Sequence, residues 1–232
     1  MGLRVSILIN IIFAVFCAWY FGMHVGFDVY YQKYITPKET FFDDIYYKAK
    51  VAAYIELNRQ IDNDKKYIVF VGDSLVEQWP VHEFFTGQNI INRGIGFDTT
   101  VGVLNRLESN LNNINIAKLF LMIGHNDLKY RSVDETIENI KTVLSEVKAD
   151  KKYFMSVLPS AAHNNKAVKQ LNARIQQFCH SNKIGYINLY PLFFDEDGSI
   201  SAQLYYDGVH LNVKGYLKLS ELINQFIPQI SS

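Results

Sequence analysis

The chain alternates between short apolar runs and longer stretches in which apolar residues recur at helical spacing. The apolar runs are rich in β-branched and aromatic residues and predict strands at residues 67–71, 89–91, 118–123, 153–158 and 185–189. The helical spacing predicts helices at residues 99–112, 133–148, 166–182 and 213–227. Continuous apolar strands separated by amphipathic helices are typical of a parallel sheet covered on both faces. The pattern therefore predicts one three-layer α/β/α domain.

A long apolar segment precedes this alternation. Residues Val5–Met23 carry no charge, and only Ser6, Asn10 and Gly22 interrupt their apolar and aromatic run. Nineteen helical residues rise about 28 Å, which is close to the thickness of the hydrocarbon layer of a membrane. The sequence that follows, Trp19–His24, offers no small-x-small cleavage site. We therefore expect an uncleaved transmembrane helix rather than a cleaved signal peptide.

The charges around this segment predict its orientation. Arg4 precedes the span, whereas Asp28 and Lys33 follow it and nearly cancel. By the positive-inside rule, the N-terminus stays in the cytoplasm and the domain lies beyond the membrane, in a periplasmic or extracellular location. The expected organisation is a membrane anchor at residues 1–23, a connector with an amphipathic helix at 24–65, and the α/β domain at 66–232. The helical pattern covers residues 39–61, and its apolar positions include Phe42, Ile45, Ala49 and Leu57.

Composition narrows the possible partners. The chain has 232 residues, 23 basic and 23 acidic side chains, and therefore no formal net charge, which argues against a nucleic-acid partner. Its two cysteines, Cys17 and Cys179, lie in the span and in the domain, so they predict no disulfide within the domain. The sequence specifies no oligomeric state.

Four polar clusters occupy the positions where a site is expected. In open α/β sheets, ligands bind beyond the carboxyl ends of the strands. Three clusters directly follow predicted strands and the fourth precedes the last helix; they are residues 72–75, 92–100, 124–128 and 206–212. Each cluster alone is most simply a turn or a helix cap. Together, in this order along one domain, they predict a shared site at one rim of the sheet.

The clusters contain the groups that nucleophilic catalysis requires. Ser74 is a candidate nucleophile, and a serine hydroxyl needs a base to accept its proton. His210 is the candidate base, and Asp207, three residues earlier, can bind the other nitrogen of the imidazole. The Asn126 amide, the Ser74 N–H and an N–H of the second cluster could stabilise an oxyanion.

Other chemistries lack their motifs. The remaining histidines are scattered, there is no H-E-x-x-H and there are no paired cysteines, so we expect no metal site. The chain has no phosphate-binding loop, and Gly94-x-Gly96 lacks the third glycine of a dinucleotide fingerprint. We therefore expect no cofactor.

The combined clusters resemble a known family, the SGNH hydrolases, also called GDSL esterases and lipases. Val71–Leu75, Gly124–Asp127 and Asp207–His210 resemble its first, third and last blocks, and Asn92–Thr100 resembles the second block of the branch that includes platelet-activating-factor acetylhydrolase and bacterial carbohydrate esterases. The resemblance covers residues 66–228. It implies a flavodoxin-like sheet of five parallel strands and a metal-free serine esterase, with Ser74 as nucleophile, His210 as base and Asp207 as its partner.

Two positions depart from the family pattern. Phe97 stands where the family usually has glycine, so the backbone donor of the second block could be Gly94, Gly96 or Phe97, and we place it at Gly96 or Phe97. With the Ser74 N–H and the Asn126 amide, this donor would complete the oxyanion hole implied by the resemblance. The second departure is a histidine at position 125 in place of a commoner threonine. A surface or hydrogen-bonded histidine is expected there, and a second titrating group near the site is the alternative.

The sequence thus predicts a membrane-anchored serine esterase. Short acyl esters are the expected substrates, including O-acetyl groups on a cell-envelope glycan, and Phe97 is expected to disfavour long acyl chains. A lysophospholipase, a thioesterase or an O-acetyltransferase at the membrane is an alternative. A second alternative is a catalytically silent, membrane-tethered glycan-binding protein, which would not react at Ser74.

Overall fold

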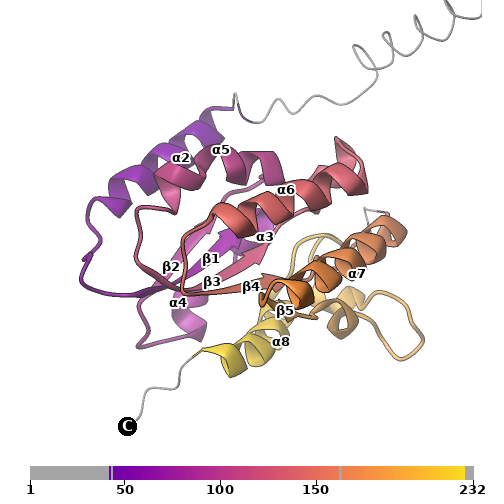
Figure 1. Cartoon of the computed structure of the whole chain (residues 1–232). Helices are drawn as coiled ribbons and strands as arrows, with labels where there is room; N and C mark the ends of the chain where they lie inside the picture. Colours follow the sequence, from indigo (N-terminus) through magenta and orange to yellow (C-terminus); the bar gives the residue numbers. More distant parts are fainter. Residues whose placement is uncertain (1–41, 43, 162–163, 228–232) are drawn as a thin grey trace, which may run out of the picture. The chain divides into compact units, whose positions relative to one another are not determined.

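A five-stranded parallel sheet forms the centre of the computed structural model, which describes residues 42, 44–161 and 164–227. The strands are β1 (Tyr67–Gly72), β2 (Ile90–Gly94), β3 (Ile116–Met122), β4 (Lys151–Met155) and β5 (Gly185–Ile187). Their order in space is β2-β1-β3-β4-β5, and every neighbouring pair is parallel (Figure 1). This is the flavodoxin-like order. The predicted five-stranded parallel sheet is confirmed.

Strand β1 lies between β2 and β3, where the strand order reverses. Its residues Val69, Phe70 and Val71 have no solvent exposure, as expected for a continuous apolar run covered on both faces. Its last residue, Gly72, is in register with Gly94 of β2 and Met122 of β3. The three strands therefore end at the same level, at the switch point where open α/β sheets bind ligands.

The four long helices predicted after the strands are present with small shifts at their ends. They are α5 (Thr100–Asn110), α6 (Val133–Glu146), α7 (Asn165–Ser181) and α8 (Val213–Ile223). Each begins after a polar residue whose side chain accepts a hydrogen bond from the backbone of the first turn; these residues are Thr99, Ser132, Asn164 and Asn212. Such N-caps satisfy backbone donors that have no partner within the helix.

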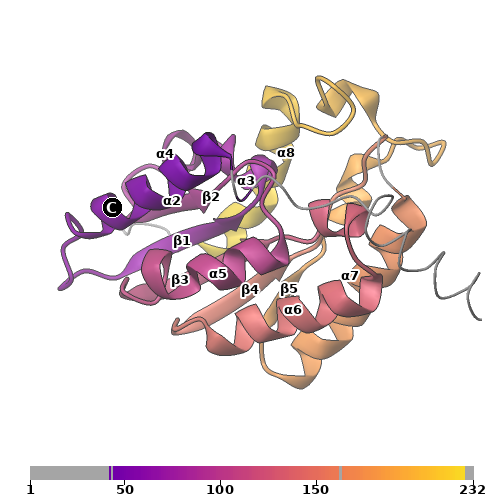
Figure 2. The same cartoon turned by 90° about the horizontal axis from the view of Figure 1, so that it is seen from above.

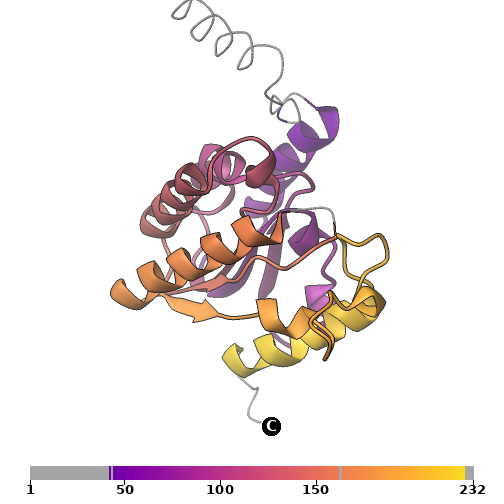
Figure 3. The same cartoon turned by 90° about the vertical axis from the view of Figure 1, so that its right-hand side faces the viewer.

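The helices cover both faces of the sheet. Side chains of α5, α6 and α7, among them Val103, Ile140 and Leu171, form one buried cluster with the strands. The other face packs against α8 and against two short helices that the sequence pattern did not predict, α3 (Ser74–Glu77) and α4 (Val81–Phe84). Figure 2 shows α5 and α6 crossing over the strands, and Figure 3 shows α7 and α8 on opposite sides of the sheet. The three-layer α/β/α architecture is confirmed.

Helix α2 (Ile45–Asn58) precedes the sheet and packs against α5 (Figure 1). Its residues, which were expected to form an amphipathic helix, belong to the same compact unit as the sheet. The helix was predicted correctly, but its buried face was not. The expected apolar face included Ile45 and Leu57, which are exposed, whereas the buried side chains are Tyr47, Tyr54 and Asn58.

The predicted transmembrane helix at residues 5–23 lies outside the described residues. Within residues 42, 44–161 and 164–227, no helix is long and apolar enough to cross a membrane.

Candidate active site

The four polar clusters meet at the carboxyl end of the sheet, around the end of β1. Ser74 follows β1 directly, the second cluster follows β2, and Asn126 begins the short helix η3 (Asn126–Lys129) after β3. His210 lies in the loop before α8 and reaches the Ser74 hydroxyl. The convergence predicted from the sequence is therefore observed for Ser74 and His210, which lie 136 positions apart.

Ser74 is the first residue of α3, and its neighbours fix the turn between strand and helix. The Asp73 carboxylate caps α3 by accepting the Leu75 N–H at 3.0 Å, so the Ser74 side chain is not needed as a cap. Gly72 has no room for a side chain, because a Cβ there would lie 2.2 Å from the Met122 carbonyl oxygen and 2.5 Å from a methyl carbon of Val76. The turn thus leaves the Ser74 hydroxyl available for other contacts.

His210 joins Ser74 to Asp207. Its Nε2 lies 3.0 Å from Ser74 Oγ, and its Nδ1 lies 2.7 Å from Asp207 Oδ2. A carboxylate can only accept hydrogen bonds, so Nδ1 carries a proton and Nε2 is left as the acceptor for the Ser74 O–H. This is the arrangement in which a histidine acts as general base toward a serine nucleophile.

Asp207 is held as a carboxylate by its own turn. Its Oδ1 accepts the backbone N–H of His210 at 2.7 Å and that of Val209 at 2.9 Å. The hydrogen bonds from the backbone and the ring of His210, with that from Val209, lower the pKa of Asp207 to about 2. Gly208 makes the turn possible because its φ is +83°. The partner of the histidine is therefore ionised at every ordinary pH.

Tyr206 contacts the histidine from the other side and was not identified from the sequence. Its ring stacks on that of His210 with the centroids 5.6 Å apart and the planes at 15°. Its hydroxyl donates to Gln78 Oε1 at 3.1 Å, at the end of the helix that begins with Ser74. The contact links the loop that carries His210 to α3. The only sequence signal was the position of Tyr206 beside Asp207.

The predicted oxyanion donors differ in whether a protein acceptor already binds their N–H groups. The Gly96 N–H donates to Glu77 Oε2 at 2.7 Å, so it is not free to bind a substrate oxygen, and this part of the prediction is corrected. Within the described parts of the chain, no acceptor binds the backbone N–H of Ser74 or Phe97. Asn126 Nδ2 donates to the Asp98 carbonyl at 3.0 Å, which leaves its second N–H for another acceptor.

Phe97 adopts a conformation that side chains rarely take. Its φ is 65°, in the left-handed region, and its side chain is 67% exposed. Glycine adopts this conformation at no steric cost, whereas other L-residues do so at about 1–2 kcal/mol. The left-handed backbone thus explains why glycine is the usual residue at this position.

Two buried aspartates near the site, Asp98 and Asp127, form ion pairs and hydrogen bonds with other side chains. Asp98 pairs with Arg106 at 2.7 Å, and both side chains are almost fully buried. Asp127 accepts hydrogen bonds from the Thr100 N–H and hydroxyl and forms an ion pair with Arg131. These contacts join the second cluster to the start of α5 and to the loop after β3.

Asp73 has a strongly shifted pKa. Burial is the main cause, the Leu75 N–H opposes it, and the nearby carboxylates of Asp98 and Asp127 add to it; together they raise the pKa of Asp73 to about 7. The folded protein therefore binds a proton at Asp73 that the unfolded chain releases near pH 4.

Replacing Asp73 with asparagine is expected to make stability less dependent on pH. Since the pKa of Asp73 is higher in the folded state, its contribution to the free energy of unfolding is full below about pH 4 and falls as the pH rises to about 7. Asparagine keeps the acceptor for Leu75 but does not titrate. Denaturant unfolding at pH 4.5, 6 and 7.5 should show Asp73→Asn gaining stability relative to the wild type as the pH rises. A difference that stays constant with pH would contradict the assignment.

A family comparison places these residues among known enzymes. Residues 70–218 match the model of the GDSL-like Lipase/Acylhydrolase family. This match includes Ser74, Asn126, Asp207 and His210. The chain belongs to the GDSL-like lipase/acylhydrolase family. It is therefore an ester-hydrolysing enzyme, as the sequence analysis predicted.

Individual relatives agree with this family. Platelet-activating factor acetylhydrolase IB subunit alpha2 of Rattus norvegicus is 28% identical over 177 residues, which cover 70% of this chain and 76% of that protein. The structure of a GDSL-like lipase from Bacteroides thetaiotaomicron has a TM-score of 0.68 at 27% identity, covering 77% of this chain and 97% of that one. An acetylxylan esterase from Geobacillus stearothermophilus has the same fold, with a TM-score of 0.60 at 16% identity and coverage of 71% and 95%.

His125, the second departure of this acylhydrolase from the family pattern, is a buried and hydrogen-bonded side chain. Its side chain is buried, and its Nε2 lies 3.1 Å from the Ser160 hydroxyl. The hydrogen-bonded histidine expected from the sequence is therefore observed.

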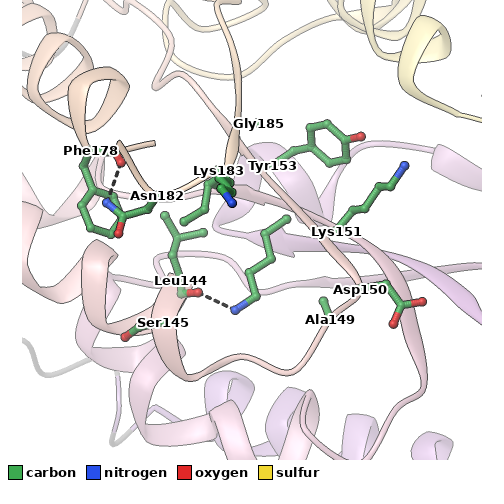
Figure 4. A pocket seen from close by; sticks show the side chains of 12 residues that line it. Leu144, Ser145, Ala149, Asp150, Lys151, Tyr153, Phe178, Asn182, Lys183 and Gly185 are labelled. Atoms are coloured by element: carbon green, nitrogen blue, oxygen red, sulfur yellow. Dashed lines mark hydrogen bonds between the residues drawn. The ribbon is translucent and has the colours of Figure 1, made fainter. Parts of the chain in front are cut away.

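A pocket of about 620 Å³ lies away from the acylhydrolase site. It is formed at the opposite end of the sheet, where β4 and β5 begin, and its lining includes Lys151, Lys183 and Phe178 (Figure 4). The Lys152 ammonium within it donates to the Leu144 carbonyl at 2.7 Å. No residue of the Ser74, His210 and Asp207 set lines this pocket. Among the described residues, no group of three or more His, Cys, Asp or Glu side chains could hold a metal ion.

Proposed function

We propose that this acylhydrolase is a serine esterase that acts through an acyl-enzyme intermediate on short, acetyl-type esters. The observation that carries the proposal is the continuous contact from Ser74 Oγ to His210 Nε2 at 3.0 Å and from His210 Nδ1 to Asp207 Oδ2 at 2.7 Å. Its chain order, Ser–Asp–His, is one of several in which this set of side chains acts in hydrolases.

The first half of the reaction transfers the acyl group to the enzyme. Ser74 Oγ attacks the ester carbonyl carbon while His210 Nε2 takes the hydroxyl proton, and the Asp207 carboxylate stabilises the imidazolium that forms. The carbonyl oxygen becomes an oxyanion, which binds the N–H groups of Ser74 and Phe97 and the free N–H of Asn126. The imidazolium then gives its proton to the alkoxide, and the alcohol leaves.

The second half returns the enzyme to its starting state. His210 takes a proton from a water molecule, and the resulting hydroxide attacks the acyl carbonyl. The same donors stabilise the second oxyanion. Collapse of this intermediate releases the carboxylic acid and restores the proton to Ser74 Oγ.

Two observations support an acetyl-type ester with a bulky alcohol. The rat relative at 28% identity is a platelet-activating factor acetylhydrolase. The side chains of Phe97 and Tyr206, which lie beside the catalytic set, are also 67% and 61% exposed. Exposed apolar rings beside Ser74 can contact the large alcohol part of an ester, such as a glycan or a lipid. We further propose that the apolar segment 5–23 anchors the enzyme to a membrane beside such a substrate.

Replacing Phe97 with glycine is expected to shift the acyl-chain preference toward longer chains. The exposed Phe97 ring belongs to the residue that supplies an oxyanion donor, so it can obstruct chains that extend past the acetyl group. We expect the ratio of kcat/KM for C8 over C2 p-nitrophenyl esters to rise about tenfold, the effect of removing about 1.4 kcal/mol of steric conflict. Exposed Leu57, on α2, provides the control, since Leu57→Gly should leave the ratio unchanged.

A preference of the wild type for C8 over C2 esters would contradict the acetyl-type assignment. Labelling with a fluorophosphonate tests the more general proposal, because this reagent reacts with an activated serine. Labelled Ser74 is expected. A folded protein that neither labels at Ser74 nor hydrolyses any ester of the series would instead be a binding protein.

A further inference from the structure

Helix α2 contacts the loop that carries the proposed oxyanion donor, although it lies outside the region matched by the family model. The Tyr54 hydroxyl donates to the Gly94 carbonyl at 2.6 Å, and the Tyr47 hydroxyl donates to Asp98 Oδ1 at 3.0 Å. Between these two points, Ile95 is fully buried against the same tyrosines. The loop from Gly94 to Asp98 is thus held at both ends by an element that precedes the sheet.

Glu77 connects the middle of this loop to α2. Its carboxylate accepts the Gly96 N–H at 2.7 Å, binds the Lys50 ammonium at 2.6 Å, and accepts the Tyr46 hydroxyl. The Glu77 side chain is only 15% exposed. Since Glu77 belongs to the short helix that begins with Ser74, one carboxylate joins three elements: the nucleophile helix, the second-block loop and α2.

The loop packs closely on this carboxylate. A Cβ on Gly96 would lie 3.0 Å from Glu77 Oε2 and 3.7 Å from a ring carbon of Tyr46. The next residue, Phe97, has a φ of 65°, and non-glycine residues stay in such a conformation only where surrounding contacts enforce it. Those contacts act on its two neighbours, Gly96 through Glu77 and Asp98 through Tyr47 and Arg106.

We propose that Glu77, held by Tyr46 and Lys50 of α2, is a positioning residue for the oxyanion hole. By binding the Gly96 N–H it fixes the Ile95–Gly96 peptide, which directly precedes the peptide that carries the Phe97 N–H. With Gly96 held in this way, the Phe97 N–H keeps the orientation required to bind the developing oxyanion. Helix α2 holds this loop directly through Tyr47 and Tyr54 and indirectly through Glu77, which makes α2 a part of the catalytic unit rather than a tether. The role rests on the proposed esterase function, because it assigns a donor of that reaction.

Glu77→Ala in the full-length chain tests this role by the separation of kcat from KM. Removing one oxyanion donor costs about 10²–10³ in kcat, and a displaced donor is expected to cost about 10–100-fold. KM for p-nitrophenyl acetate should change by less than about threefold, since the donor acts mainly in the transition state. Glu77→Gln keeps an acceptor for the Gly96 N–H and should recover most of the loss. The matched control is Glu56→Ala on α2. Among the described residues, the Glu56 carboxylate pairs with the nearby Arg59 alone, so this substitution should leave kcat unchanged.

A double-mutant cycle separates positioning from general stability. Glycine adopts a φ of 65° without help from Glu77, so Glu77→Ala should cost no more than about threefold in kcat when it is made in a Phe97→Gly chain. If Glu77→Ala lowered kcat by the same factor in the wild-type chain and in the Phe97→Gly chain, the positioning role would be overturned. A loss of thermal stability without a selective loss of kcat would also overturn it, since that result indicates packing alone.

Different experimental results would overturn the proposed esterase function and the positioning role of Glu77. If wild-type protein hydrolyses the ester and Ser74→Ala does not, the esterase proposal holds, and an unchanged kcat in Glu77→Ala overturns only the positioning role. If wild-type protein neither hydrolyses the ester nor reacts with a fluorophosphonate at Ser74, both are overturned.

Discussion

Ser74→Ala is expected to lower kcat for p-nitrophenyl acetate by about 10⁴–10⁶-fold and to abolish fluorophosphonate labelling. The substitution removes the only group in the site that can form the acyl-enzyme. The oxyanion donors remain, so a small rate above that of the uncatalysed reaction should persist. The measurements are steady-state kinetics and mass spectrometry of the labelled peptide.

The structure indicates that this variant folds normally. Asp73, not Ser74, caps α3, and the Ser74 hydroxyl contacts only His210 among the described side chains. Alanine is also a favourable residue in a helix. Thermal unfolding should therefore change little, which separates loss of chemistry from loss of fold.

Ser145→Ala provides a matched control at the other end of the sheet. Its hydroxyl is exposed and donates to the Thr142 carbonyl at 2.8 Å, and the residue lines the 620 Å³ pocket. We expect wild-type kinetics for Ser145→Ala. If Ser74→Ala kept wild-type turnover while Ser145→Ala lost it, the active site would have to be sought in that pocket.

The sheet and the convergence of Ser74, His210 and Asp207 could be predicted because both follow from short-range sequence patterns. Buried parallel strands appear as continuous apolar runs, and their carboxyl ends lie at one edge of the sheet. Ser74 and Asn126 each lie in a polar cluster that directly follows such a run. Asp207 and His210 lie within one turn of each other, so their contact needs no knowledge of the distant chain. The order of the clusters along the sequence was therefore sufficient.

The buried face of α2 could not be predicted from apolar spacing. Its partner is a loop that offers a carbonyl oxygen at Gly94 and a carboxylate at Asp98, and both need hydrogen-bond donors when they are buried. Tyrosine supplies a buried ring and a donor together, which an aliphatic side chain cannot do. Tyr47 and Tyr54 are therefore buried, while Ile45 remains exposed.

The choice between Gly96 and Phe97 as oxyanion donor depended on a contact that the sequence does not display. Glu77 lies 19 positions before Gly96 and binds its N–H. A backbone donor is available for substrate only if no protein group binds it first. This is a property of the folded loop, and the same reasoning explains why Glu77 itself was not identified. Nothing in the residues next to Glu77 in the sequence indicates a contact with Gly96.

Asp207→Asn is expected to lower kcat by about 10³–10⁴-fold, because the substitution reverses the direction of one hydrogen bond; the corresponding change in a serine protease costs about 10⁴. Asparagine Oδ1 can still accept the N–H groups of Val209 and His210, as Asp207 Oδ1 does. Its Nδ2 would then face His210 Nδ1 as a donor. The imidazole proton must move to Nε2, where it points at Ser74 and prevents the ring from accepting the serine proton.

The low pKa of Asp207 simplifies the comparison with Asp207→Asn. Since the pKa is about 2, the wild-type carboxylate stays ionised in any assay above about pH 4, so protonation of this carboxylate does not contribute to the difference between the two proteins. Asp197→Asn is the control: Asp197 also accepts the N–H of a residue two positions later, Ser199, but it binds no histidine in the described part of the chain. We expect Asp197→Asn to retain wild-type kcat. If Asp207→Asn also retained it, Asp207 would be a turn residue that merely places the His210 backbone, and the histidine would act without a carboxylate partner.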